Sequence, residues 1–127
     1  MFNQQLMDVA NKLVEGCKAN NEREGLDTLY HPEAESHEAM AMEGSGSRMV
    51  KGIDGIKAKH DWWENAHEMH DGSVEGPFFH GADKFSVIFG LDVTNRETKE
   101  RMQMKEVALY TVDQGKIVKE EFFYGAG

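Results

Sequence analysis

The first third of the chain shows hydrophobic spacing that is typical of helices. Its apolar residues recur at steps of three and four, which places them on one face of a helix. They are Phe2, Leu6, Val9, Leu13 and Cys17. The pattern predicts a helix over about residues 2–19. Asn20 and Asn21 then end it and cap a short second helix that includes Tyr30. This helix cannot continue through Pro32, because proline lacks the backbone N–H.

Beyond Pro32 the spacing changes to alternation and then back to a helical period. Residues 34–42 alternate between two differently composed faces, which predicts a strand. The strand ends at a Gly/Ser loop over 43–47, whose spacing is not that of a phosphate-binding loop. From Ile53, the apolar residues and the amphipathic His60 and His67 lie on one helical face, and a third helix is predicted to run to about Met69.

The C-terminal half has the pattern of an antiparallel meander. Four strands are predicted, over residues 70–80, 85–93, 101–112 and 117–124. The residues 113–115, Asp-Gln-Gly, are typical of a tight hairpin between the last two strands. Helices first and strands afterwards, with one strand between helices, predict a single α+β domain over residues 1–127 whose curved sheet wraps its helices.

Composition and charge exclude several classes of partner. The chain has 14 Lys and Arg against 23 Asp and Glu, a formal net charge of -9, so we expect no nucleic-acid partner and no membrane partner. It has no run of the roughly 20 apolar residues that a membrane span needs, and its N-terminus lacks the apolar block of a signal peptide. Cys17, the single cysteine, cannot form an internal disulfide. We therefore expect a cytoplasmic protein.

The most informative positions are carboxylates on otherwise apolar strand faces. Burial raises the pKa of a carboxyl group and makes it a usable acid or base near neutral pH. The three residues are Glu38, Glu106 and Glu120. The alternative is that each pairs with a buried Arg, Lys or His, or lies at a dimer interface.

Histidine, tryptophan and methionine add further candidates. His67 and His70 lack the spacing of a zinc protease motif, so we predict no metal site and consider His67 as a proton donor to substrate. Trp62 and Trp63 are adjacent, so one can face the sheet while the other borders a pocket mouth. Methionines on two strand faces suggest an adaptable apolar lining, with plain core packing as the alternative. They are Met40, Met42, Met102 and Met104.

Four stretches of this chain carry a family resemblance over nearly its whole length. They are Leu26–Tyr30, Lys59–Trp63, Val74–Phe78 and Glu106–Tyr124. With the predicted order of elements, the chain resembles the SnoaL-like group of the nuclear transport factor two-like superfamily, which includes ketosteroid isomerases and polyketide cyclases. The resemblance implies three N-terminal helices packed in a strongly curved, mixed but mainly antiparallel sheet, which forms a cone with an internal apolar pocket. It also implies a homodimer.

The resemblance extends to the site only in part. Glu38 matches the place of the isomerase base, and Glu106 is a reserve acid or base. The positions that match the isomerase oxyanion donors fall near Leu13 or Val14 and near Val107 or Ala108, so those donors are missing here. A replacement could use Tyr110, Tyr124 or His67. The residues expected to bind the ligand are Met40, Trp62, Trp63, Phe89, Met104, Glu120, Phe122 and Tyr124.

These observations favour a cofactor-free isomerase, cyclase or lyase that acts on a hydrophobic small molecule. In this hypothesis Glu38 abstracts a proton next to a carbonyl group and a Tyr or His stabilises the oxyanion. The alternatives are a non-catalytic module for small-molecule binding or dimerisation, and a metal-dependent hydrolase.

Overall fold

The computed structural model describes residues 3–19, 22–39 and 47–124. Within these ranges the chain forms three helices and six strands. The helices are α1 (Gln4–Lys18), α2 (Glu22–Thr28) and α3 (Ile53–Ala66). The strands are β1 (Tyr30–His37), β2 (Met49–Lys51), β3 (His67–His80), β4 (Lys84–Asn95), β5 (Arg101–Asp113) and β6 (Lys116–Phe123). The predicted α+β class with three helices is confirmed.

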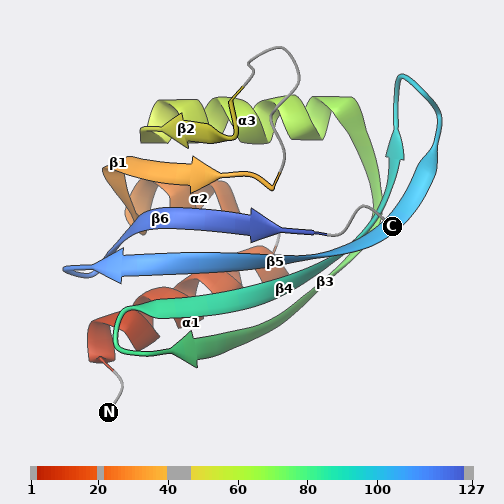
Figure 1. The fold of residues 1–127 in the computed structure, drawn as a ribbon. Helices are drawn as coiled ribbons and strands as arrows, with labels where there is room; N and C mark the ends of the chain where they lie inside the picture. Colours follow the sequence, from red (N-terminus) through yellow and green to blue (C-terminus); the bar gives the residue numbers. More distant parts are fainter. Residues whose placement is uncertain (1–2, 20–21, 40–46, 125–127) are drawn as a thin grey trace.

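The six strands form one mixed sheet in the order β2-β1-β6-β5-β4-β3. β1 and β6 run parallel, and the other neighbouring pairs are antiparallel. The sheet is curved but not closed, since β2 and β3 are its two edges, and β3 to β5 bend towards the end of α3 (Figure 1). The mixed, mainly antiparallel sheet is therefore as predicted and is consistent with a cone.

The helices cover one face of this sheet, which we call the inner face. Helix α1 packs on β3 and β4, and α3 packs on β1, β2 and β3. Asn3 caps α1 by accepting a hydrogen bond from the backbone N–H of Gln5 at 2.8 Å. The buried stripe of α1 runs along the predicted face and contacts the same core as Phe85 of β4. It consists of Leu6, Val9, Ala10, Leu13 and Val14.

The turn between β5 and β6 also forms as predicted. Gln114 has a φ of 50° and Gly115 a φ of 79°. Two successive residues with positive φ are typical of the type I′ turn, whose twist matches that of the strands it joins. Among the helices of the described ranges, none is both long and apolar enough to cross a membrane.

The structure corrects the boundaries around the first strand. Strand β1 begins at Tyr30, which we had predicted in the second helix, so Pro32 lies inside a strand. Its pairing with β6 shifts register between Tyr30 and Glu35, and β2 pairs with β1 only from Glu35 onwards. Pro32 thus lies outside the regular ladder, where its missing N–H is tolerated. The strand ends at His37 instead of Met42, and residues 40–46 lie outside the described residues.

Two further boundaries differ from the prediction. Helix α3 ends at Ala66 instead of Met69, because the Ala66 carbonyl accepts a hydrogen bond from the backbone N–H of Arg96 at 2.9 Å and β3 starts at His67. The short strand β2 was missed, since three residues are too few for alternation to be recognised.

Candidate functional site

The three predicted carboxylates lie on the inner face and interact with one another. We call Glu38, Glu106 and Glu120 the carboxyl cluster. Glu120 of β6 lies between Ser36 of β1 and Tyr110 of β5 in the sheet register. Glu38 follows the end of β1, and its charge acts on both of the other carboxyl groups. Residues far apart in the sequence therefore form one charged group.

Lys59 of α3 brings a positive charge to this cluster. Its side chain is 11% exposed, and its Nζ donates to Glu38 Oε1 at 2.7 Å and to the Ser36 hydroxyl. The ammonium also lies 4.7 Å from the centre of the Phe122 ring, within cation–π range. Glu38, with 18% of its side chain exposed, is thus paired as well as partly accessible.

Lys59 was missed at the level of sequence, although a signal for it exists. We had assigned His60 and His67 to the inward face of the third helix. Lys59 follows Ile56 by three residues and precedes Trp63 by four, so it lies on the same face as both. Ile56 is fully buried, and Lys59 extends past it to the sheet. His60 follows Ile56 by four residues and fits the same face, so helical spacing alone does not distinguish Lys59 from it.

Glu120 is the most deeply buried member of the cluster, with a relative exposure of 1%. Its Oε2 accepts a hydrogen bond from the Tyr30 hydroxyl at 3.2 Å. Its Oε1 has no hydrogen-bond partner among the described residues. The Ser36 hydroxyl nevertheless favours the ionised carboxylate and so lowers the pKa of Glu120. Burial raises the pKa of Glu120 to about 7, against the opposing effects of Lys59 and Tyr30.

Glu106 is half-buried and faces Phe89 across the β4–β5 ladder. Burial raises its pKa to about 7, and the charge of Glu38 adds to this rise, while Lys59 opposes it. Burial also raises the pKa of Tyr124, with further contributions from Glu38 and Glu106. Glu106 and Tyr124 therefore belong to the same electrostatic environment.

Tyr110 of β5 lies next to Glu120 of the cluster in the sheet register. It is 3% exposed and stacks on Phe85 with ring centres 4.8 Å apart. Burial raises the pKa of Tyr110 well above its usual range, and the charge of Glu120 raises it further. Several of the predicted site residues therefore share the inner face. They are Glu38, Phe89, Glu106, Tyr110, Glu120, Phe122 and Tyr124.

His67 and the two tryptophans lie together in a different place. His67 stacks on Trp63 with ring centres 4.3 Å apart, and its Nδ1 lies 3.0 Å from the Trp63 carbonyl oxygen. Trp62 is 51% exposed and meets His67 edge to face. A hollow of about 450 Å³ adjoins these residues. It is lined by Trp62, Asn65, Ala66, His67, Asn95, Arg96 and Glu97.

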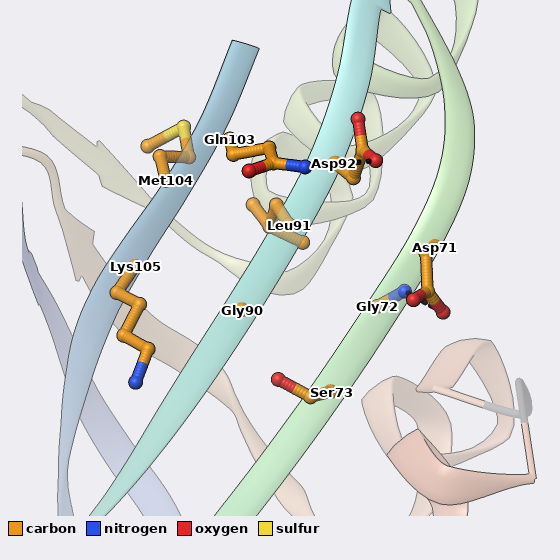
Figure 2. A pocket seen from close by; sticks show the side chains of 9 residues that line it. All are labelled: Asp71, Gly72, Ser73, Gly90, Leu91, Asp92, Gln103, Met104 and Lys105. Atoms are coloured by element: carbon orange, nitrogen blue, oxygen red, sulfur yellow. Dashed lines mark hydrogen bonds between the residues drawn. The ribbon is translucent and has the colours of Figure 1, made fainter.

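A second hollow, of about 320 Å³, lies on the opposite face of the sheet (Figure 2). We call this the outer face. The Ser73 hydroxyl lies there against Gly90, in the place that a Cβ of residue 90 would need, and Asp92 accepts two hydrogen bonds from Arg101, each at 2.9 Å. Arg101 thereby lowers the pKa of Asp92 to about 2. Met104, a predicted ligand contact, borders this hollow, but no member of the carboxyl cluster lines either hollow.

The remaining predicted residues divide between the described and undescribed parts of the chain. Phe89 and Met104 are half-buried, and Met40 lies outside the described residues. In the described ranges, no three His, Cys, Asp or Glu side chains are grouped so that they could hold a metal ion. The arrangement is suited to proton transfer, since it combines carboxyl groups that titrate near neutral pH with an ammonium group.

A family model, described as the SnoaL-like domain, matches residues 2–124. The chain belongs to the SnoaL-like family. A solved structure from Mesorhizobium loti, a candidate SnoaL-like polyketide cyclase, is 36% identical with a TM-score of 0.86. The match covers 93% of this chain and 97% of that one. A search of curated proteins gave no match.

More distant structures share the SnoaL-like fold. A candidate isomerase from Bacillus subtilis is 13% identical with a TM-score of 0.73, and the match covers 96% of this chain and 87% of that one. A Mycobacterium tuberculosis protein, solved in complex with estradiol-17β-hemisuccinate, is 16% identical with a TM-score of 0.72. That match covers 98% of this chain and 96% of the other. At these identities the likeness extends to the fold alone.

The SnoaL-like chain lacks polar donors where the sequence resemblance led us to look for them. Leu13 and Val14 are buried in the core. Ala108 is fully buried as well, while Val107 is on the outer face and 38% exposed. An isomerase-like oxyanion site in this chain would therefore need donors from other residues.

Proposed function

We propose that this protein binds an apolar small molecule on its inner face and catalyses proton transfer at a carbon next to a carbonyl group, without a cofactor. This is chemistry of the isomerase, cyclase or lyase type. The carboxyl cluster carries the proposal, because two of its members have pKa values of about 7. A general acid or base is most effective when its pKa is close to the working pH.

Within the cluster, we assign the proton transfer to Glu106. One oxygen of Glu38 already accepts a hydrogen bond from Lys59. Glu120 is 1% exposed and tied to Tyr30, so a ligand has little access to it. Glu106 is only half-buried, and the half-buried rings of Phe89 and Phe122 give its surroundings apolar character. Glu38, the base favoured by the sequence, then has the role of holding the ammonium of Lys59.

The relatives support an apolar ligand. The Mycobacterium tuberculosis protein was solved with a steroid ester, and another structure of this fold is a computationally designed 17-OHP binder. We therefore choose estradiol-17β-hemisuccinate as the binding probe, with affinity measured by isothermal titration calorimetry.

The catalytic part is tested with 1-tetralone, an apolar ketone that can enolise. Incubation in D₂O and proton NMR report exchange of the hydrogens next to its carbonyl. We expect the wild-type protein to accelerate this exchange and Glu106→Gln to slow it by about a hundredfold or more. Glu75→Gln is the matched control, because Glu75 lies on the outer face and pairs loosely with Lys105 at 3.8 Å.

The outcome separates the proposal from its alternative. Exchange that is lost in Glu106→Gln and retained in Glu75→Gln supports catalysis. Binding of the steroid ester with no exchange by the wild-type protein would contradict catalysis and favour a non-catalytic binding module. Such a module is compatible with the pairing of Glu38 with Lys59 and of Glu120 with Tyr30.

We further propose a homodimer formed through the outer face. Val107 and Phe123 are directly opposed on β5 and β6 and are 38% and 50% exposed. Neighbouring exposed apolar residues of this kind mark interaction surfaces. We expect Phe123→Lys to convert the dimer to a monomer in sedimentation velocity, and Met49→Lys, on the edge strand β2, to leave it dimeric. A monomeric wild-type protein would contradict this.

A further inference from the structure

Lys59 is held in place in a manner unlike Lys57, the other lysine of α3. Lys57 lies two residues away, is 38% exposed and pairs with Asp27 on the surface. Lys59 is 11% exposed and reaches the sheet. Its ammonium is fixed by an ion pair with Glu38, a hydrogen bond to Ser36 and the ring of Phe122. Three contacts, from β1, from the residue that follows it and from β6, therefore restrict the position of one positive charge.

This ammonium retains capacity to bind a further acceptor. A lysine ammonium has three N–H donors, and among the described residues two accept from it, Ser36 and Glu38. The Phe122 ring attracts the charge without consuming a lone-pair acceptor. Within the described parts of the chain, one N–H of Lys59 thus has no protein acceptor and can donate to a ligand oxygen.

The ammonium also acts on the proposed proton-transfer group. Lys59 lowers the pKa of Glu106, while the other two carboxyl groups of the cluster raise it. The charge of Lys59 and the charge of Glu106 are therefore electrostatically coupled across the inner face. A negative charge that passes from Glu106 to a ligand bound on this face is therefore still attracted by the same ammonium.

We propose that Lys59 stabilises the oxyanion that forms when Glu106 removes a proton from the ligand, an inference that rests on the proposed function. The Glu106 carboxylate takes the proton, and the C–H electron pair forms a C=C bond. The carbonyl π pair moves to the oxygen, which accepts a hydrogen bond from Lys59. Return of the proton from Glu106 to carbon restores a ketone. The net charge of the site does not change, because the negative charge moves only from Glu106 to the ligand oxygen. The ammonium that stabilises this oxygen is already in place before the reaction.

The experiment uses 2-naphthol, an apolar phenol that resembles an enol. Phenols of this kind titrate near pH 10. A naphthol bound with its oxygen on Lys59 is stabilised as the ion, so its long-wavelength absorption band should appear at pH 7.5. We expect this band with the wild-type protein and with Lys57→Met, and its loss in Lys59→Met. Lys59→Arg, which keeps the charge, should retain part of it.

The exchange of 1-tetralone is measured in parallel. Loss of one oxyanion donor commonly costs a hundredfold or more in rate, so we expect Lys59→Met to slow exchange by about a hundredfold. Near-ultraviolet circular dichroism verifies that each variant is folded. The ionisation of bound naphthol depends on the charge at the site and not on the fold. If Lys59 had a purely structural role, the naphtholate band of the bound ligand would therefore be the same in a folded Lys59→Met variant as in the wild-type protein.

The results distinguish the two levels of the proposal. Naphthol that binds the wild-type protein in neutral form, while tetralone exchange proceeds, would overturn the role of Lys59 alone. A naphtholate band that persists in Lys59→Met would do the same. Failure of the wild-type protein to bind naphthol and to catalyse exchange would overturn the proposed function and this inference with it.

Discussion

Replacement of Glu120 by Gln tests the electrostatic account of the inner face through stability alone. Burial raises the pKa of Glu120 from the ordinary value of 4.5 to about 7 in the folded protein. The folded state therefore binds the proton more tightly than the unfolded state. The stability that Glu120 contributes is fully present below pH 4.5 and is lost as the pH rises towards 7.

The expected size follows from the difference in pKa. Each unit corresponds to 1.36 kcal/mol, so ionisation of Glu120 costs the folded state about 3 kcal/mol above pH 7. Gln has nearly the same shape and can still accept the hydrogen bond from Tyr30, but it does not ionise. We therefore expect Glu120→Gln to gain stability relative to the wild-type protein as the pH rises, up to about 3 kcal/mol at pH 8.

Urea unfolding, followed by tryptophan fluorescence between pH 5 and 9, measures this gain. The informative quantity is the difference in free energy of unfolding between the variant and the wild-type protein as a function of pH. Effects of the substitution that do not depend on pH shift this difference by a constant and leave its slope against pH unchanged. Glu75→Gln, on the outer face, is the control. A difference that stays flat from pH 5 to 9 would refute the claim that Glu120 is buried with a raised pKa.

Three further substitutions test neighbouring contacts. Lys59→Met should raise the pKa of Glu106 above about 7, because Lys59 now lowers it; carbon NMR titration of the glutamate carboxyl groups measures this, and Lys57→Met should cause no such rise. Tyr30→Phe removes the hydrogen bond to Glu120, so the pKa of Glu120 should rise in the same titration, and the free energy of unfolding should fall by about 1 kcal/mol. Phe85→Ala removes a fully buried ring stacked on Tyr110 and should cost about 3 to 5 kcal/mol in urea unfolding; a cost below about 1 kcal/mol would contradict its place in the core.

Much of the fold could be predicted from the sequence because its elements have regular periods. The long helix α1 repeats its apolar residues over four turns, β5 alternates in burial along its length, and the apolar residues of β4 alternate from Phe85 to Val93. The errors fall where the period is short or tertiary contacts decide. Strand β2 has three residues, and α3 gives way to β3 at His67 because that strand pairs with Asn95 of β4.

The site shows a similar division between local and long-range information. Carboxylates on apolar strand faces could be identified because alternation reveals the face of each residue, and the structure unites the three of them. His67 stacks on Trp63 at the junction of α3 and β3, apart from the carboxyl cluster, and no local pattern indicates this position. Lys59 could have been found from its spacing, but its partner Glu38 is 21 residues away in the sequence, and no local pattern indicates that they meet.

Glu106 and Glu120 illustrate why a raised pKa does not by itself define a catalytic group. Burial raises both pKa values to about 7. Glu120 is enclosed and bonded to Tyr30, so its ionisation changes the stability of the fold, whereas Glu106 is half-buried beside the charge of Lys59. We therefore expect the two variants to separate the effects: Glu120→Gln should alter the pH dependence of unfolding and largely preserve tetralone exchange, and Glu106→Gln should abolish exchange. If Glu120→Gln also abolished exchange in a folded protein, the proton-transfer role would have to be shared between the two carboxyl groups.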